Sequence, residues 1–281
     1  MLERGIVKQI NDFVFQKPRT VQEISHLIGK SWLTTDRYIE KIAAEEGTIS
    51  VQTFRGGTKG ALKIVYWNLN PVQASSFQER LLKQIESGRH KSDFSPSEIY
   101  QHVDDKKRDA FYITDDKYHE KENYDDLKKL LMETESQILS FSGNLTFCNI
   151  GEGNKKIFDV LEFLAGKGVK IKILTRVELP GIENIKKVLA INEKIGKDMV
   201  EVRHCYQPLR VNIIDNKILS MKEVKDPKYF SKGELKEPIN IIYRIYDDEW
   251  IEWMQKVFWN LFRTSVSAEK RIKELGKIRK F

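Results

Sequence analysis

The sequence predicts an α/β protein with a small N-terminal domain of helices and a hairpin and a larger C-terminal domain in which helices pack on a mixed sheet. Within residues 1–70, segments with helical spacing of apolar residues precede two strand-like segments. Within residues 126–262, strand-like and helix-like segments alternate. The chain has 281 residues, 40% of them hydrophobic and 32% charged, so it is long and apolar enough to form a core in both domains.

The first two helices have well-marked ends. Apolar residues from Ile6 to Val14 fall on one helix face, and Pro18 ends this helix because proline disfavours helix in the residue before it. Thr20 and Glu23 have the spacing of a capping box, which predicts the start of a second helix. We expect that helix to end at Gly29.

A third helix and a hairpin complete residues 1–70. Ser31 is an N-cap candidate for a helix that runs to about Glu46. Two strands follow, over Thr48–Phe54 and Ala61–Asn68, and the loop of residues 55–60 between them has three glycines that tolerate positive φ. The order of helix, capped helix, short turn, capped helix and hairpin is the plan of a winged helix-turn-helix domain.

A winged helix-turn-helix domain places its third helix in the major groove of duplex DNA. Arg37 lies on the face opposite the predicted core and is the strongest candidate for a base or phosphate contact. The glycine-rich loop lets Arg55 and Lys59 approach a phosphate or a narrow minor groove, although an ordinary hairpin with solvated charges is the alternative. The candidate DNA-binding residues are Ser31, Trp32, Thr34, Thr35, Arg37, Tyr38, Lys41, Arg55 and Lys59.

Two further segments flank the C-terminal domain. Residues 71–125 carry an excess of acids and predict a helical connector, with the highly charged run Asp104–Glu122 as a solvated linker. Residues 263–281 predict a basic helix, which is either a solvated surface or a source of added phosphate contacts. The net charge of +7 permits a polyanionic partner without requiring one.

The predicted elements of residues 126–262 follow from apolar spacing and from glycine positions. Helices are expected over Leu127–Leu139, Ile157–Leu164, Ile182–Ile195 and Glu249–Phe262, and strands over Asn144–Ile150, Val169–Leu174, Val200–Arg203, Arg210–Ile214 and Ile239–Tyr246. The last helix is rich in aromatic residues at helical spacing, which favours a core position; a dimer interface is the alternative.

Three runs of the N-terminal domain form a recognisable set: Thr20-Val-Gln-Glu-Ile-Ser, Ser31-Trp-Leu-Thr-Thr-Asp-Arg-Tyr-Ile and Phe54-Arg-Gly-Gly-Thr-Lys-Gly-Ala-Leu-Lys-Ile-Val-Tyr-Trp. In these runs the chain resembles archaeal TrmB-like proteins, a family of winged-helix DNA-binding proteins that includes sugar-responsive transcription regulators and a chromatin protein. The segment Ser76–Val103 is closer to the chromatin-protein branch. The resemblance implies duplex DNA binding and dimerisation.

The second domain contains Gly168-Val-Lys-Ile-Lys-Ile-Leu, Val200-Glu-Val-Arg, a strand that reaches Asp215, and Tyr246-Asp-Asp-Glu-Trp before the aromatic helix. In these runs it is similar to the phospholipase D-like domain that such proteins carry. Active members of that superfamily have a His-x-Lys-x4-Asp motif in which the histidine attacks phosphorus. Aligned on Asp215, this chain has Pro208 in place of the histidine and Arg210 in place of the lysine. Proline has no nucleophilic atom, so we expect no catalytic residue here. Arg210 either binds an anion or pairs with Asp215 or another acid.

The leading functional hypothesis is a non-enzymatic protein that binds double-stranded DNA with low sequence preference, as a chromatin-type binder and transcription repressor, and that acts as a homodimer or larger homo-oligomer at the chromosome in the cytoplasm. A site-specific regulator that senses a sugar or anion effector through the C-terminal domain is the alternative. A phosphodiesterase or nuclease is less favoured, because it needs another nucleophile, such as His204. Neither Cys148 nor Cys205 belongs to a metal motif, and we expect no metal, no cofactor and no membrane segment.

Overall fold

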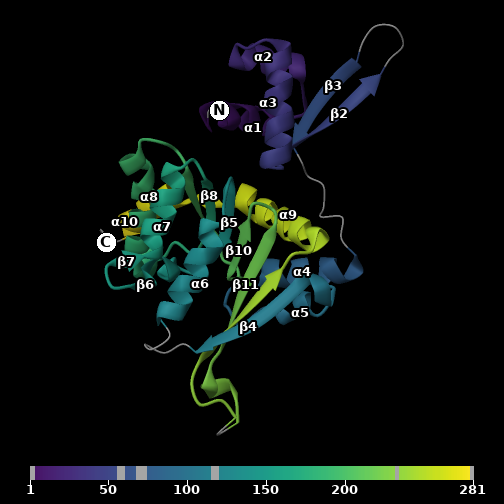
Figure 1. Ribbon diagram of the computed structural model, residues 1–281. Helices are drawn as coiled ribbons and strands as arrows, with labels where there is room; N and C mark the ends of the chain where they lie inside the picture. The colour runs from purple at the N-terminus through teal and green to yellow at the C-terminus, as the bar shows by residue number, and fades with distance from the viewer. Residues whose placement is uncertain (1–3, 56–60, 68–74, 115–119, 232–233, 279–281) are drawn as a thin grey trace. The chain divides into compact units, whose positions relative to one another are not determined.

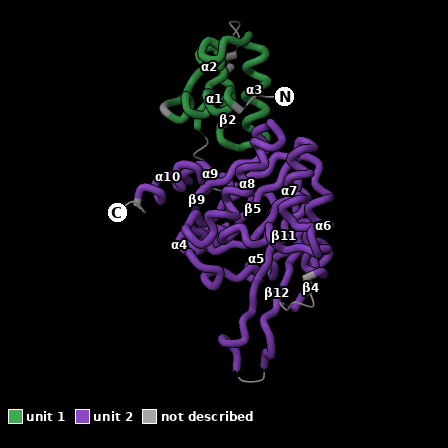
Figure 2. The backbone as a smooth tube through the Cα atoms, turned by 90° about the vertical axis from the view of Figure 1, so that its left-hand side faces the viewer, with its two compact units in different colours: residues 1–73 green, residues 74–281 purple. Residues whose placement is uncertain are grey.

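The computed structural model describes residues 4–55, 61–67, 75–114, 120–231 and 234–278. The chain divides into two compact units, residues 1–73 and 74–281 (Figures 1 and 2). The sequence predicted four segments. The predicted connector and the predicted basic tail are instead parts of unit 2, because each contributes a strand to its sheet.

Unit 1 consists of three helices and a three-stranded antiparallel sheet. Its elements are α1 (Arg4–Gln16), β1 (Arg19–Thr20), α2 (Val21–Ile28), α3 (Trp32–Glu45), β2 (Ile49–Arg55) and β3 (Ala61–Trp67), with the strands in the order β1-β3-β2. The predicted helices and hairpin are thus confirmed, and β1 is an addition that the sequence did not predict.

The ends of the helices in unit 1 are fixed by the predicted side chains. Thr20 accepts a hydrogen bond from the amide of Glu23, whose carboxylate accepts one from the amide of Thr20 at 2.7 Å. Gly29 has a left-handed φ of 63°, which ends α2. The core holds apolar side chains from all three helices and both long strands: Ile10, Ile24, Ile39, Ile42, Ile49 and Val65.

Unit 2 is built on an eight-stranded mixed sheet in the order β13-β9-β8-β5-β10-β11-β12-β4. Its strands are β4 (Arg108–Thr114), β5 (Gln137–Phe141), β8 (Lys170–Thr175), β9 (Val200–His204), β10 (Val211–Ile214), β11 (Ile218–Lys225), β12 (Ile239–Ile245) and β13 (Val266–Ser267). A separate pair joins β6 (Gly151–Glu152) to β7 (Lys155–Lys156). Strands β5, β8 and β9 are parallel, and the other neighbours are antiparallel. The predicted α/β domain with a mixed sheet is confirmed.

Helices cover both faces of this sheet. They are α4 (Ser76–Ser87), α5 (Ser97–Tyr100), α6 (Glu120–Met132), α7 (Ile157–Gly166), α8 (Ile182–Ile195), α9 (Asp248–Thr264) and α10 (Ala268–Ile278). Along β5, Ile138 belongs to the core that α6, α7 and α8 share, whereas Phe141 contacts Phe258 of α9 with ring centroids 5.2 Å apart. Because side chains alternate along a strand, α9 packs on the opposite face from α7. The buried aromatic residues of α9 confirm the predicted core helix.

Three predicted elements of unit 2 are wrong. The helix expected over Leu127–Leu139 ends at Met132, and β5 follows it because Gln137–Phe141 forms a buried parallel strand. The strand expected over Asn144–Ile150 is replaced by a short 3₁₀-helix, Thr146–Asn149. The expected linker Asp104–Glu122 contains β4, which pairs along its length with β12.

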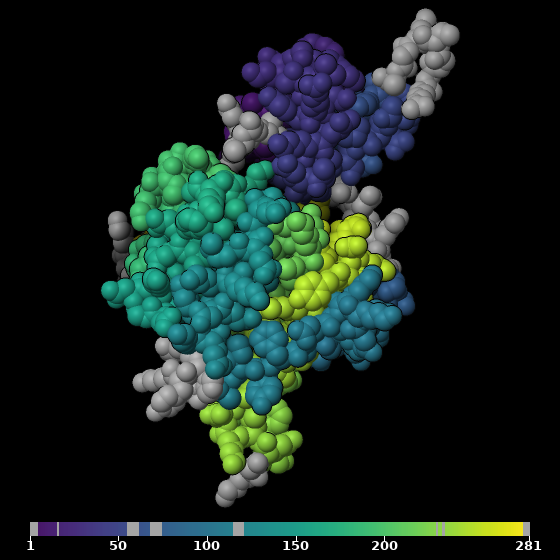
Figure 3. All heavy atoms as spheres, in the orientation of Figure 1, coloured from purple at the N-terminus to yellow at the C-terminus, as the bar shows by residue number. Residues whose placement is uncertain are grey.

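The hairpin of β11 and β12 projects beyond the helices of unit 2 (Figures 1 and 3).

Among the described residues, no helix combines the length and the apolar character that crossing a bilayer requires.

Candidate functional site

The amino-terminal end of α3 presents an exposed surface in unit 1, where hydroxyl groups lie beside the apolar side chains of Trp32 and Leu33. Ser31 caps the helix by accepting a hydrogen bond from the amide of Thr34 at 3.2 Å, and the two hydroxyl groups lie 2.9 Å apart. Trp32 is 40% exposed. Arg37 and Lys41 are exposed further along the helix. Arg37 forms no ion pair with any described residue, so its guanidinium is available to a ligand.

Thr35 and Tyr38 do not belong to this exposed surface. Thr35 has 0% exposure, and its hydroxyl donates to the carbonyl oxygen of Ser31 at 2.9 Å. The proposal that Thr35 contacts DNA is therefore wrong, because the residue lies on the core face of α3. Tyr38 is half-buried and packs against the core of unit 1.

The basic residues of the hairpin are less available than their number suggests. Lys63 of β3 lies 2.6 Å from a carboxylate oxygen of Asp36 and 3.4 Å from one of Glu40. The hydrogen bond to Asp36 raises the pKa of Lys63. Arg55 ends β2, and Lys59 lies outside the described residues.

Lys41 also forms an ion pair on the exposed surface. Its ammonium group lies 3.5 Å from the carboxylate of Glu45, one helical turn along α3. Both side chains are exposed, so solvent screens this pair and it holds the lysine weakly. Of the predicted contacts on α3, Arg37 is therefore the cation that is both exposed and free of a described partner.

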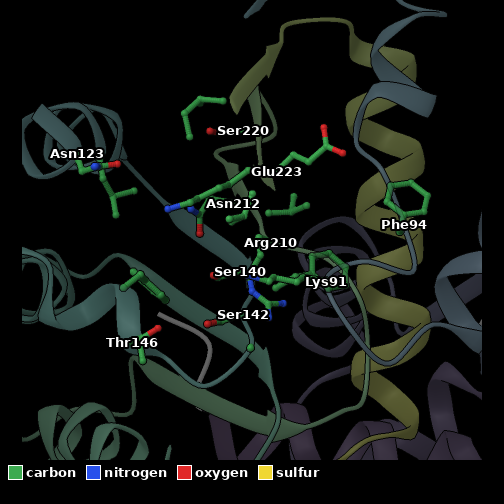
Figure 4. Close-up of a pocket in the computed structure, with 18 of the residues that line it drawn as sticks. Lys91, Phe94, Asn123, Ser140, Ser142, Thr146, Arg210, Asn212, Ser220 and Glu223 are labelled. Carbon is green, nitrogen blue, oxygen red and sulfur yellow. The ribbon is translucent and has the colours of Figure 1, made fainter. Parts of the chain in front are cut away.

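Unit 2 contains a cavity of about 940 Å³ at the carboxyl ends of β5 and β8, beside the start of β10. Two arginines line it: Arg176 follows β8, and Arg210 precedes β10. Figure 4 shows Arg210 among Ser140, Ser142 and Lys91. Each of these residues lines the cavity.

The Arg210 guanidinium is largely desolvated. Burial, and next the charge of Arg176, lower the pKa of Arg210 to about 10. One of its N–H groups donates to the carbonyl oxygen of Leu209 at 2.7 Å. The guanidinium also lies against the backbone of Gly143, where a β-carbon would come within 2.3 Å of Arg210 Nη2. The absence of a side chain at residue 143 therefore makes room for Arg210.

Arg176 lies beside the same glycine. Its backbone amide donates to the carbonyl oxygen of Gly143 at 2.9 Å, which fixes the start of its side chain at the edge of the sheet. Its Nε is buried and has no hydrogen-bond partner. Among the described residues, neither Arg176 nor Arg210 forms an ion pair with a carboxylate.

The acids that line the cavity are paired with other groups. Asp126 contacts Arg244, and Asp226 lies 2.9 Å from the ammonium group of Lys228. Glu223 lies 2.7 Å from Lys225, and it accepts hydrogen bonds from the hydroxyl groups of Ser95 and Tyr243. The two arginines therefore give one wall of the cavity a positive charge that no carboxylate of the described residues compensates.

The three positions of the phospholipase D-like motif do not converge. Pro208 is buried and packs toward Gly88, whereas Arg210 lines the cavity. Asp215 lies at the opposite end of β10, where its carboxylate accepts hydrogen bonds from the amides of Glu135, Ser136 and Gln137. The alternative of an ion pair between Arg210 and Asp215 is therefore wrong, because the strand separates them.

His204 is not positioned as a substitute nucleophile in this cavity. It does not line the cavity, and its Nδ1 accepts a hydrogen bond from the amide of Val177 at 3.0 Å. Burial lowers its pKa. Cys148 is a core residue whose burial raises the pKa of its thiol to about 12. Among the described residues, no cluster of three His, Cys, Asp or Glu side chains could hold a metal ion.

Sequence reasoning missed most of the polar wall of the cavity. Ser140, Asn212 and Ser220 lie side by side on β5, β10 and β11, in register. Each is a polar residue with an apolar residue on either side of it in its strand, which is a signal that the sequence contains. Arg176 gave no such signal, because it lies just beyond the end of its strand.

No family model and no curated protein matches the sequence. Among solved structures, NucT from Helicobacter pylori aligns at 14% identity over 57% of this chain and 99% of its own, with a TM-score of 0.41. Nuc from Salmonella typhimurium, a phospholipase D family member, aligns at 13% identity over 57% of this chain and 97% of its own, also at 0.41. Yeast tyrosyl-DNA phosphodiesterase aligns at 13% identity over 48% of this chain and 31% of its own, at 0.24.

These comparisons correct the expectation that the chain is not an enzyme, since the structures it resembles include a phospholipase D family member and a phosphodiesterase. That expectation rested on a single position. Proline at residue 208 removes one nucleophile and the mechanism that depends on it. It leaves in place the two guanidinium groups and the hydroxyl groups that line the cavity.

Proposed function

We propose that this protein binds duplex DNA through unit 1, which acts as a winged helix-turn-helix domain with α3 in the major groove and the β2–β3 hairpin as the wing. The observation that carries the proposal is the exposed amino-terminal half of α3, where the side chains of Ser31, Trp32 and Arg37 face solvent. Hydroxyl groups and the first amides of a helix suit phosphate oxygens, and an arginine suits a phosphate or a guanine.

The same surface favours binding with low sequence preference. Lys63 is held by Asp36 and Glu40, and Lys41 lies beside Glu45, so few cations remain to read base edges. Together with the resemblance to TrmB-like proteins, this supports a chromatin-type binder and transcription repressor associated with the chromosome. A homodimer or larger assembly would bring several copies of unit 1 to one duplex and raise affinity through effective concentration.

Gel-shift titration of the full chain against a duplex tests the proposal. We expect the logarithm of the binding constant to fall with the logarithm of salt concentration, with a slope of about −0.9 for each phosphate neutralised. Arg37→Ala should weaken binding and lower this slope by about one phosphate. Lys8→Ala, an exposed change on α1, is the matched control. Binding that ignores salt, or an Arg37→Ala variant that binds like the Lys8→Ala variant, would refute the assigned surface.

Unrelated duplexes and genome-wide occupancy test the low sequence preference. We expect similar affinities for duplexes of different sequence and broad occupancy of the chromosome. A few sharp sites, together with strong discrimination among duplexes in vitro, would instead establish a site-specific regulator.

A second candidate function is effector sensing by unit 2, and the cavity with its two arginines favours it. In this case a ligand of the cavity changes the affinity of the protein for DNA, and DNA changes the affinity for the ligand by the same factor. Gel shifts with and without sugars and anions measure this coupling. Equal DNA affinity at saturating ligand would exclude it.

Phosphoester hydrolysis is a third candidate for the same cavity. Arg176 and Arg210 could stabilise the charge of a phosphoryl transition state, while the nucleophile must be a group other than Pro208. Incubation of the purified chain with plasmid and divalent metals tests for cleavage. Cleavage that Arg210→Gln abolishes would assign it to this cavity, and cleavage that the substitution leaves intact would assign it elsewhere.

A further inference from the structure

The ligand class of the unit 2 cavity follows from its charges. The guanidinium groups of Arg176 and Arg210 both line the cavity, and neither pairs with a carboxylate among the described residues, whereas every acid in the described lining has a cationic partner. Burial lowers the pKa of Arg210, and repulsion from the charge of Arg176 lowers it further. An anion between the two guanidinium groups would offset this repulsion and accept hydrogen bonds from their remaining N–H donors.

The charges and the donors of the two guanidinium groups together indicate a doubly charged oxyanion. A guanidinium has five N–H donors, and one of those of Arg210 donates to the carbonyl oxygen of Leu209. The buried Nε of Arg176 donates to no described group. A phosphomonoester carries a charge of about −1.5 to −2 near neutral pH and three acceptor oxygens, whereas a phosphodiester carries one negative charge. The phosphomonoester therefore matches the two guanidinium groups better.

The cavity is also too large for a bare phosphate. About 940 Å³ is the size of a site for a complete small molecule. Away from the arginines, hydrophobic residues line much of the wall, but one part of it is polar, with Ser140, Asn212 and Ser220 in register and Asn123 from α6 opposite them in Figure 4. Hydroxyl and amide groups of this kind pair with the hydroxyl groups of a sugar or polyol.

We infer that the cavity binds a small sugar phosphate or polyol phosphate, with its phosphomonoester between Arg176 and Arg210 and its hydroxyl groups on the polar wall. The inference rests on the second candidate function, effector sensing by unit 2, and is independent of DNA binding by unit 1. Gly143 is a positioning residue in this site, because a larger residue there would displace the Arg210 guanidinium.

Isothermal titration calorimetry of the full chain without DNA tests the inference, with glucose 6-phosphate, glucose, inorganic phosphate and a short single-stranded oligonucleotide as probes. We expect glucose 6-phosphate to bind, phosphate to bind more weakly, and glucose to give no signal. Arg176→Gln and Arg210→Gln should each lower the affinity for glucose 6-phosphate by about 10- to 100-fold, as expected for loss of charge-assisted hydrogen bonds. Arg80→Gln, an exposed change on α4, is the matched control and should bind like the wild type.

Two further measurements separate a specific site from misfolding or general attraction. Without ligand, Arg176→Gln and Arg210→Gln should melt no lower than the wild type, because each removes a repulsive charge. Gly143→Ala keeps both arginine charges and should still lower the affinity for glucose 6-phosphate by about 10-fold. Binding that survives all three substitutions, equal binding of glucose, or an oligonucleotide that displaces the sugar phosphate would overturn the inference.

The DNA titration distinguishes the two proposals. If glucose 6-phosphate binds as expected while DNA affinity is unchanged, the ligand class stands and the effector function fails. If other small molecules alter DNA affinity while no sugar phosphate binds, the effector function stands and the inferred ligand class fails.

Discussion

Asp215 ties the β10–β11 turn to the start of β5, and its replacement should destabilise unit 2. One carboxylate oxygen accepts hydrogen bonds from the amides of Ser136 and Gln137, both at 2.8 Å, and from the Ser136 hydroxyl at 2.6 Å. The other accepts one from the amide of Glu135 at 2.6 Å. Asp215→Asn preserves the shape and suits the positive φ of 48°. It turns an N–H group toward the Glu135 amide and removes the charge from the remaining bonds.

The expected loss follows from the change in hydrogen bonding. A hydrogen bond to a charged group contributes about 1.5–3 kcal/mol and a neutral one about 0.5–1.5 kcal/mol. One lost bond and three weakened ones give a loss of about 2–3 kcal/mol in the free energy of unfolding, with allowance for partial exposure of the site. For a unit of this size the melting temperature should fall by about 5–10 °C.

The dependence of this loss on pH tests its origin. Desolvation opposes ionisation of Asp215, but the hydrogen bonds from Glu135, Ser136 and Gln137 outweigh it and lower its pKa. The ionised carboxylate therefore contributes its full stability above the unfolded value of about 3.9, and this contribution is lost as pH falls through the lower folded pKa. The difference in the free energy of unfolding between wild type and Asp215→Asn should be constant from about pH 7 to 5 and shrink below about pH 4.

Thermal unfolding of both proteins across this pH range measures the gap, with the exposed Glu237→Gln change as the control. Equal melting temperatures at neutral pH would refute the structural role of Asp215. A gap that stays constant into acid would refute the contribution of its charge.

Three further substitutions probe the packing of each unit, each measured by urea unfolding. Lys63→Met leaves the Asp36 carboxylate, whose side chain is 12% exposed, without its partner, and should lower the free energy of unfolding by about 2 kcal/mol. The double variant with Asp36→Leu should recover much of this loss. Thr20→Ala removes the capping box of α2 and should cost about 1 kcal/mol. Phe258→Ala empties a fully buried site against Phe141 and should cost about 3–5 kcal/mol, and a loss below 1 kcal/mol would contradict the packing described for α9.

Unit 1 was predictable because its signals are local. A capping box at Thr20 and Glu23, a left-handed glycine at residue 29 and an N-cap at Ser31 each act within one turn of helix. The sequence could not show that Lys63 pairs with Asp36, since these residues meet only when the hairpin packs on α3. The availability of each basic residue is therefore a tertiary property.

Unit 2 was harder because two of its strands depend on distant partners. Gln137–Phe141 continues the apolar spacing of the preceding helix, and only its pairing with β8 and β10 identifies it as a strand. Arg108–Thr114 lies within the highly charged run Asp104–Glu122 and lacks a strand-like neighbour in sequence. The cavity could be predicted only in part, because alternation places Asn212 on one face of β10 but does not reveal that Arg176 lies nearby.

The position of β4 in the sheet has a consequence for how the chain folds during synthesis. β4 is the first strand of unit 2 to leave the ribosome, yet its partner β12 is made only after most of the unit. The nascent chain must therefore carry an unpaired strand edge while more than a hundred residues are added, a state in which strands are prone to aggregate. Its two charged residues, Arg108 and Asp109, would keep this edge soluble until β12 is made.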